Sequence, residues 1–379
     1  MSDVDIIIFI QQANLTWEHG KPMTFLVQPQ GSSQISTNEP DPFKMAANEC
    51  GEYGEHLLST GRWSEAEKYF LAQLDKAKTE TDLDQQAYAY RSLGTIYCFR
   101  GNIEQGMMLY HHAISLAEEV HDLRLGGIIC NDVGEVYRKQ GDYPAAIEYY
   151  SKSLEVAAKL GKEESLAVVY GNLGIVYKNQ GQYEQAIQAY EISLVYSNRQ
   201  GIDRLSANQY GNLGIIYELK GSFTEAIKMQ EKSLEISLRI GHQKGTADAY
   251  GNLGLIQFEL GNYTPANDMF QKALAIMQSM GDNPGIALVY GNLGVLNEEL
   301  GKLEQAAQCY ERGLTVLDRI GDKHNGAKFH NNLGLLYYEQ KLMTEARDHL
   351  HKAQALYEMV GDRQNVGKVQ QELQRCKED

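Results

Sequence analysis

Five asparagines stand at a constant spacing of 40 residues in this chain of 379. Their amide side chains carry both donors and acceptors, so a row of them can hold the backbone of an extended peptide without reading its side chains. The same amides can instead bond to neighbouring helices and so set the distance between structural units. The sequence favours the first role and leaves the second open. The five are Asn172, Asn212, Asn252, Asn292 and Asn332.

These asparagines belong to a longer repeat. The run Tyr-Gly-Asn-Leu-Gly begins at Tyr170 and recurs at Tyr210, Tyr250 and Tyr290, and a weaker copy begins at His330. A fixed period of about 20–50 residues is typical of a solenoid, in which each unit buries its apolar face only against its neighbours. Such a fold displays a surface more often than it builds a catalytic pocket.

Each repeat has the pattern of two helices. Apolar residues fall on one helical face over residues 167–177, and residues 183–194 carry a second amphipathic stripe. Gly181 and Gly201 end these helices, because glycine readily takes the left-handed conformation that a helix end often needs. Eight units also place a glycine inside the first helix, which predicts that another helix comes too close there for a Cβ. These are Gly54, Gly94, Gly134, Gly174, Gly214, Gly254, Gly294 and Gly334.

The order of these residues carries a family resemblance. An aromatic residue, then Leu-Gly, Tyr, Gly, Ala and a second aromatic residue resembles the tetratricopeptide repeat over roughly residues 46–378. Units with Tyr-Gly-Asn-Leu-Gly look like those of the Pins/LGN-type spindle-orientation adaptors, and bacterial tetratricopeptide proteins are looser relatives. The resemblance implies an all-α, right-handed superhelical solenoid, with eight helix-turn-helix repeats over residues 45–362 and a capping helix over residues 363–379.

The resemblance also implies that the first helices line a concave groove, and that three positions of each repeat face it. One position is the asparagine row. Three residues later the row is apolar, which suits apolar side chains or a helix of the ligand, or else burial between helices. Four residues before each asparagine the residue varies, which is where partner specificity would lie. The apolar row is Ile175, Ile215, Leu255, Val295 and Leu335, and the varied row includes Asn208, Asp248 and Lys328.

The third repeat departs from this pattern. It carries Asp132 at the asparagine position and Glu135 at the apolar position. Two carboxylates on one wall would attract Lys or Arg side chains of a ligand. We therefore expect the N-terminal part of the groove to be the more acidic part.

Composition excludes several function classes. The net charge of −15 argues against nucleic acid as the partner, because such binders carry basic stripes, whereas it suits a neutral or basic peptide. No run approaches the roughly 20 apolar residues of a membrane span. The five cysteines are far apart and form no Cys-x-x-Cys pair, which indicates reduced thiols in a cytoplasmic protein.

Signals for catalysis are weak. The chain has no Gly-x-x-x-x-Gly-Lys loop for phosphates, and Gly171 and Gly174 lie within a repeat helix. His111-His112 and the pair His349 and His351 lack partners at metal-binding spacing. We therefore expect no enzyme activity, no cofactor and no metal.

Residues 1–44 differ from the repeats. Two apolar runs, residues 6–10 and 23–27, flank a turn signal at His19-Gly20-Lys21-Pro22, which predicts a β-hairpin. A stretch rich in Ser, Gln, Asn and Pro then reads as a linker.

Together these features predict a non-catalytic adaptor that holds an extended peptide or an amphipathic helix of a partner protein in its groove. Two alternatives stay open. The chain could be the sensor or regulatory subunit of a larger, bacterial-type enzyme or signalling complex, with residues 1–44 contacting the effector. Chains could also self-associate through residues 1–44, by pairing of strands.

Overall fold

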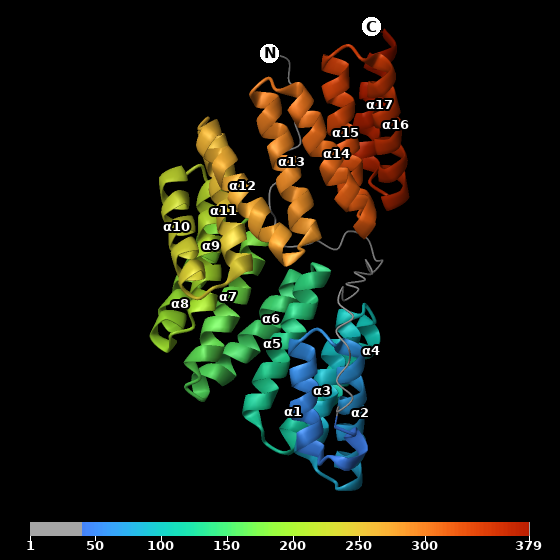
Figure 1. Ribbon diagram of the computed structural model, residues 1–379. Helices are drawn as coiled ribbons and strands as arrows, with labels where there is room; N and C mark the ends of the chain where they lie inside the picture. The colour runs from blue at the N-terminus through green and yellow to red at the C-terminus, as the bar shows by residue number, and fades with distance from the viewer. Residues whose placement is uncertain (1–39, 379) are drawn as a thin grey trace. The chain divides into compact units, whose positions relative to one another are not determined.

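The computed structural model describes residues 40–378. Within that range the chain contains 17 α-helices, preceded by one turn of 3-10 helix at Pro42–Lys44, and it contains no strand. The predicted all-α class is confirmed. The predicted hairpin falls in residues 1–39 and so lies outside the described part of the chain. The helices form eight consecutive helix-turn-helix pairs and one final helix (Figure 1).

The chain divides into two compact units, whose described parts are residues 40–202 and 203–378. We call the helices of each pair the first and the second helix of that repeat. The first unit contains α1 (Ala47–Ser59), α2 (Trp63–Thr79), α3 (Leu83–Phe99), α4 (Ile103–Glu119), α5 (Leu123–Gln140), α6 (Tyr143–Lys159), α7 (Glu163–Asn179) and α8 (Tyr183–Gln200). The second contains α9 (Asp203–Leu219), α10 (Phe223–Arg239), α11 (Gln243–Glu259), α12 (Tyr263–Met280), α13 (Asn283–Glu299), α14 (Leu303–Ile320), α15 (Lys323–Glu339), α16 (Met343–Val360) and α17 (Arg363–Glu378).

A Gly-Asp pair ends one repeat and begins the next. Gly281 takes a left-handed φ of 67° after α12, and its N–H donates to the Met277 and Gln278 carbonyls. Asp282 then caps α13, because its Oδ1 accepts a hydrogen bond from the Gly285 N–H at 3.1 Å. Glycine satisfies the end of one helix and the aspartate satisfies the start of the other. The local sequence therefore fixes where the helices break.

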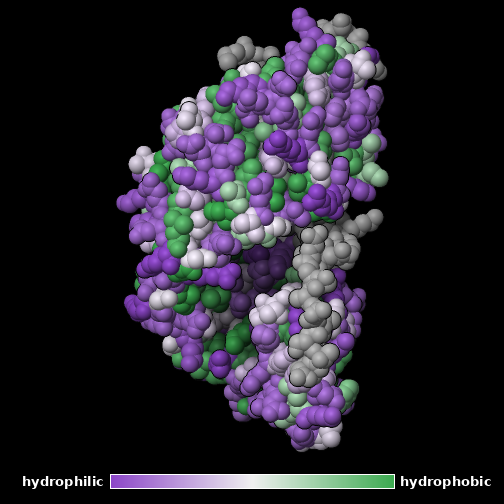
Figure 2. Space-filling view, in the orientation of Figure 1, coloured by the Kyte–Doolittle hydropathy of each residue, from purple (hydrophilic) through white to green (hydrophobic). Residues whose placement is uncertain are grey.

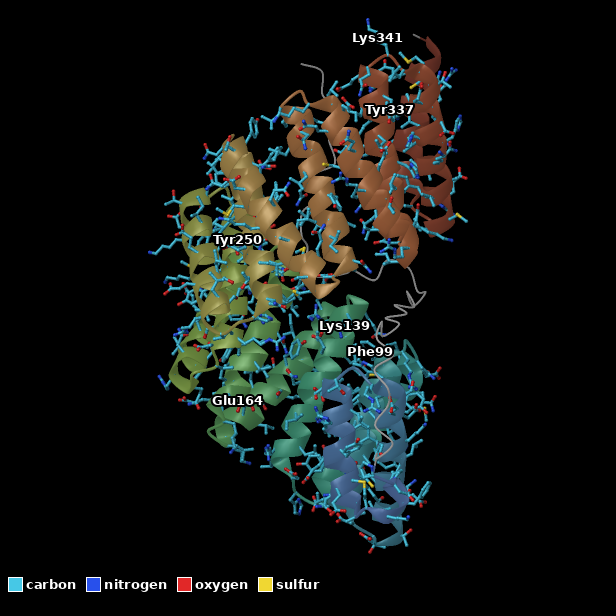
Figure 3. All side chains as sticks on the ribbon, in the orientation of Figure 1. Phe99, Lys139, Glu164, Tyr250, Tyr337 and Lys341 are labelled. Carbon is cyan, nitrogen blue, oxygen red and sulfur yellow. The ribbon has the colours of Figure 1, made fainter. Side chains whose placement is uncertain are left out.

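The turn inside the last repeat breaks the glycine pattern. Lys341 stands there, between α15 and α16, and it also takes a positive φ, of 61° (Figure 3). A left-handed backbone costs a residue with a Cβ about 1–2 kcal/mol. The eighth repeat thus keeps the turn geometry of the others at a local cost in stability.

The glycine inside each first helix lies against a side chain from the second helix of the same repeat. A Cβ added at Gly174 would lie 2.5 Å from Cε1 of Tyr190, and one at Gly254 would lie 2.6 Å from Cε1 of Phe270. The rings themselves are fully buried. The predicted lack of room for a Cβ is confirmed, and the residue that occupies the space is in most repeats an aromatic ring.

Within each unit the first helices lie next to one another. α1 contacts α3, α3 contacts α5 and α5 contacts α7, and in the second unit α9 contacts α11 and α11 contacts α13. Within a unit, each second helix packs on its own first helix and, where another helix follows in that unit, on that following helix as well. We call the side of a unit formed by its first helices the inner wall.

The last helix covers the end of the second unit. α17 packs against α16 and α15 and buries Val369, Leu373 and Cys376. The predicted capping helix is confirmed. Capping is needed because a terminal repeat has no neighbour for one of its apolar faces.

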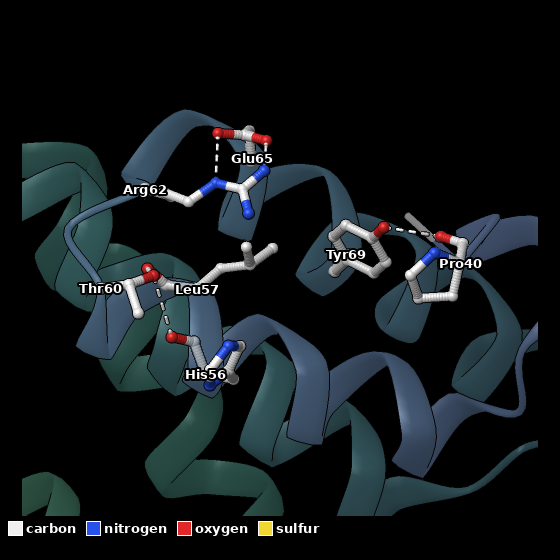
Figure 4. A network of polar contacts seen from close by, with 7 residues as sticks. All are labelled: Pro40, His56, Leu57, Thr60, Arg62, Glu65 and Tyr69. Atoms are coloured by element: carbon white, nitrogen blue, oxygen red, sulfur yellow. Dashed lines mark hydrogen bonds and ion pairs between the residues drawn. The ribbon is translucent and has the colours of Figure 1, made fainter. Parts of the chain in front are cut away.

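The segment before α1 is held by α2. The hydroxyl of Tyr69 donates a hydrogen bond of 2.6 Å to the Pro40 carbonyl (Figure 4). Lys76 donates to the Phe43 carbonyl at 3.1 Å and also to the Met45 carbonyl. Residues 40–46 are therefore part of the folded first repeat.

The surface of the helices is mostly hydrophilic on the face shown in Figure 2, with hydrophobic residues scattered among the polar ones. No helix in the described range combines the length and apolar character needed to cross a membrane.

The contact between glycine and aromatic ring leads to a paired test. Gly174→Ala should lower the free energy of unfolding, because overpacking against Tyr190 costs about 1–3 kcal/mol. The matched control is Gly126→Ala in α5, where a Cβ would meet no atom within 4 Å. The control should gain up to about 1 kcal/mol, since alanine is the better helix former. Urea unfolding followed by circular dichroism measures both, and an equal gain in the two variants would contradict the packing described here.

Candidate functional site

The asparagine row lies on the first helices but is not uniformly exposed. Asn172 in α7 and Asn212 in α9 are partly exposed. In the second unit, by contrast, Asn252, Asn292 and Asn332 keep only 6%, 5% and 3% of their surface in contact with solvent. A ligand could reach the first two in the present arrangement, whereas the other three are covered by their neighbours.

Some of these amides hydrogen-bond to neighbouring helices, whereas others have an oxygen that accepts no hydrogen bond. Asn172 donates to Oδ1 of Asn131 at 3.0 Å, which joins α7 to α5. Asn332 donates to the Tyr310 hydroxyl at 3.5 Å. The Oδ1 atoms of Asn292 and Asn332 are buried and accept no hydrogen bond. Part of the row therefore sets the packing between repeats, and its binding of a ligand stays a prediction.

The apolar row divides in the same way. Leu255 and Val295 are buried to 4% and 2% exposure and belong to the cores of their repeats. Ile175, Ile215 and Leu335 remain partly exposed. Leu255 and Val295 are therefore buried between helices, which is the alternative that the sequence left open.

The varied row is the more accessible one. Asn208 is exposed on α9. Asp248 forms an ion pair with Lys244 at 3.1 Å, and Lys328 donates to Oδ1 of Asn325 at 3.3 Å. These side chains lie where a bound segment could contact them, and their part in specificity stays a prediction.

The two carboxylates of the third repeat are balanced by the protein's own cations. Asp132 accepts a hydrogen bond of 2.7 Å from Nε of Arg91 in α3. Glu135 accepts two from Arg138, at 2.7 and 2.5 Å, and a third from the Tyr150 hydroxyl at 3.1 Å. Burial opposes ionisation of Glu135, but the Arg138 contacts outweigh it and hold the pKa of Glu135 below its usual value. These two charges are thus already paired within the first unit.

The structure adds a set of ionisable residues near the C-terminal ends of the first helices, six residues after the asparagine position. Burial and the nearby Arg138 lower the pKa of Lys178 to about 8. Burial, with the charge of Glu259, raises the pKa of Glu218 to about 7, and burial raises that of Glu298 to about 7. This row follows the same 40-residue register as the asparagines, and it lies outside the three positions of each repeat that were predicted to face the groove.

Comparison with known families assigns the repeats. Tetratricopeptide repeat models match residues 50–84, 128–194, 172–237, 205–279, 287–316 and 331–360, which together make up more than half of the chain. The chain belongs to the tetratricopeptide repeat family. Comparison with curated protein sequences finds no match.

Solved tetratricopeptide-like structures resemble the whole array. The apo form of RapI is 14% identical, with a TM-score of 0.63 over 88% of this chain and 97% of that one. A Rap protein complexed with competence and sporulation factor is 17% identical, with a TM-score of 0.57 over 88% and 97%. The apo quorum sensor NprR from B. thuringiensis is 15% identical, with a TM-score of 0.56 over 87% and 98%. At these identities the likeness shows the fold alone, and the resemblance to Pins/LGN-type adaptors stays a prediction.

The buried carboxyl of Glu298 predicts a pH-dependent stability. Its pKa rises from an ordinary 4.5 to about 7 on folding, so the folded state binds the proton more tightly and loses stability as pH rises from about 4.5 to 7. Glu298→Gln should therefore raise the free energy of unfolding at pH 8, by about 1–3 kcal/mol. The gain should shrink toward zero near pH 4.5.

Chemical unfolding at the two pH values measures this effect. The control is Glu304→Gln, which removes the same charge from an exposed position of α14. A gain of the same size and pH dependence in the control would assign the effect to net charge instead of burial.

Proposed function

We propose that this tetratricopeptide protein is a non-catalytic adaptor, whose inner wall holds a segment of a partner protein as an extended peptide or an amphipathic helix. The observation that carries the proposal is the unused hydrogen-bonding capacity of the asparagine row. Asn292 and Asn332 each bury an amide oxygen that accepts no hydrogen bond. Buried polar atoms in proteins are almost always paired, so a row that leaves acceptors open suits a ligand that brings N–H groups.

Access to these oxygens requires the first helices to separate. In a solenoid each repeat contacts mainly its neighbours, so one interface can open without unfolding the rest. Asn172 in the first unit and Asn212 in the second are partly exposed already, and each would make the first contact on the inner wall of its own unit. Partly exposed apolar residues beside them, Ile175 and Ile215, would receive side chains of the ligand.

The similar structures support a ligand-binding solenoid. One is a Rap protein in complex with competence and sporulation factor, and another is the quorum sensor NprR. The likeness is one of fold, so it favours the use of the inner wall without naming what this chain binds.

A second candidate function is that of a sensor or regulatory subunit of a larger complex, with residues 1–44 contacting the effector. The quorum sensor among the similar structures favours this candidate. The hydrogen bonds from Tyr69 and Lys76 to residues 40–45 also favour it, because they tie the end of that segment to the first repeat. Under this alternative, a chain starting at Met45 would still bind the partner segment but would no longer bind the effector. Under the adaptor proposal it would still bind both.

The adaptor proposal is tested by removing the accessible amides. Asn172→Ala combined with Asn212→Ala should weaken binding of the partner roughly fivefold to a hundredfold, because each lost hydrogen bond costs about 0.5–1.5 kcal/mol. The partner is recovered by pull-down with the wild-type chain and then titrated against both proteins. Circular dichroism confirms that the helices are intact.

A matched control replaces two exposed amides on second helices, Gln188 in α8 and Gln271 in α12, with alanine. This control should bind as the wild type does. Undiminished affinity in the folded asparagine variant would place the binding surface away from the asparagine row.

A further inference from the structure

The inner wall of the second unit ends in a row of carboxylates. α11, α13 and α15 have Glu259, Glu299 and Glu339 as their last residues, and all three are exposed. Glu298 directly precedes Glu299, and Glu218 lies one residue before the end of α9. We call these five residues the glutamate row.

The glutamate row stands where helices tolerate acidic groups least. The C-terminal end of a helix carries partial negative charge, so a carboxylate there is repelled and a cation is favoured. The third repeat shows the favourable case, since Arg138 and Lys139 occupy the two equivalent positions and both pair with Glu135. Acidic residues at the same place in successive repeats thus disfavour folding unless a cation from elsewhere meets them.

No cation of the described part of the chain forms an ion pair with this row. The carboxylates that do form ion pairs in the second unit are Asp203, Asp248, Asp282, Asp348, Asp362 and Glu372. The glutamates of the row instead repel one another. Burial is the largest influence on the pKa of Glu218 and Glu298, and neighbouring carboxylates add to it: Glu259 raises the pKa of Glu218, and Glu339 and Glu299 raise that of Glu298.

Buried oxygens behind the row also lack donors. The Tyr310 hydroxyl accepts a hydrogen bond of 3.5 Å from Asn332, and it lies near the Glu298 carboxyl, on whose pKa it has a lowering effect. Oε1 of Glu298 and Oδ1 of Asn332 are both shielded from solvent and neither has a hydrogen-bond partner. Asn332 itself is 97% buried, being 3% exposed. Two buried acceptors without a donor therefore belong to residues near one hydroxyl, and one of them is on Glu298, a member of the glutamate row.

We propose that the glutamate row binds Lys or Arg side chains of the partner segment. This inference rests on the proposed function and names the chemistry of the partner. Ammonium and guanidinium groups carry donors only, so they supply what both the exposed carboxylates and the buried oxygens lack. Basic side chains would also remove the like-charge repulsion along the row.

The geometry of the wall sets the spacing of the basic residues. Packed helices lie about 8–10 Å apart, and α11 contacts α13, so we expect Glu259 and Glu299 to be separated by about that distance. A polyproline II segment advances about 3.1 Å per residue with three residues per turn. A basic residue at every third position would therefore face the row and meet one repeat after another.

The test uses the full chain and a fluorescein-labelled peptide of repeated Lys-Pro-Pro units, followed by fluorescence anisotropy. Glu259→Gln, Glu299→Gln and Glu339→Gln are combined in one variant. We expect this variant to bind the peptide at least tenfold more weakly than the wild type does. Raising the salt concentration should weaken wild-type binding, because exposed charges are screened beyond about 8 Å at physiological ionic strength.

The control removes the same number of charges from second helices, as Glu231→Gln, Glu235→Gln and Glu311→Gln, which are all exposed. It should bind within twofold of the wild type, and a labelled Glu-Pro-Pro peptide should not bind. An equal loss in the control would show that the net charge of −15 attracts the peptide, and would overturn the proposal. Failure of the wild type to bind the Lys-Pro-Pro peptide would overturn it as well.

These outcomes are separate from the test of the adaptor proposal, which uses the natural partner and the asparagine variant. If that variant keeps its partner while the glutamate variant loses the basic peptide, the asparagine-based adaptor proposal fails and the basic-residue site stands. Circular dichroism of the glutamate variant excludes loss of fold as the cause.

Discussion

The close approach of the two helices within each repeat is the contact on which the structure depends. Glycine in the first helix lets a buried side chain of the second helix lie against the backbone, as Tyr150 does on Gly134 and Phe270 does on Gly254. Because the contact leaves no room for a Cβ, it fixes the distance between the helices to within a fraction of an ångström. Repeats of nearly constant shape follow, and within each unit they bring the first helices together as one wall.

The same packing residue also decides the polar chemistry of the wall. In some repeats it is a tyrosine whose hydroxyl reaches a first helix, as Tyr150 reaches Glu135 and Tyr310 reaches Asn332, whereas the hydroxyl of Tyr190 has no hydrogen-bond partner. In the sixth repeat the residue is Phe270, which has no hydroxyl, and the oxygen of Asn292 in the next repeat has no partner. A tyrosine at this position therefore gives the amide nitrogen of Asn332 a partner, whereas the amide oxygens of Asn292 and Asn332 both stay without one.

The two units use the C-terminal ends of their first helices differently. In the first unit Arg138 and Lys139 stand there, agree with the helix dipole and pair with Glu135. In the second unit the equivalent ends carry glutamates that oppose the dipole and have no ion pair within the described residues. Stability alone would favour basic residues at these helix ends. Glutamates there are unfavourable for the free chain, which agrees with the proposed binding of basic side chains.

The sequence by itself determined the period, the helix pairs, their ends and the glycine contact, because each depends on residues within one repeat or its immediate neighbour. Gly281 and Asp282, for example, end one helix and begin the next by local hydrogen bonds alone. The position of the asparagine row on the first helices follows from the same register. The exposure of the row does not, since Asn212 and Asn292 occupy the same position of their repeats yet only the second is buried.

Only the tertiary structure decided which of these side chains a ligand can reach and which charges are already paired. Asp132 was expected to attract a basic ligand, but Arg91, 41 residues earlier, binds it first. Exposure and pairing depend on how closely successive first helices approach and on how far each repeat is rotated from the last. The 40-residue spacing is the same in every repeat and does not encode those distances, so they had to come from the packing of the repeats.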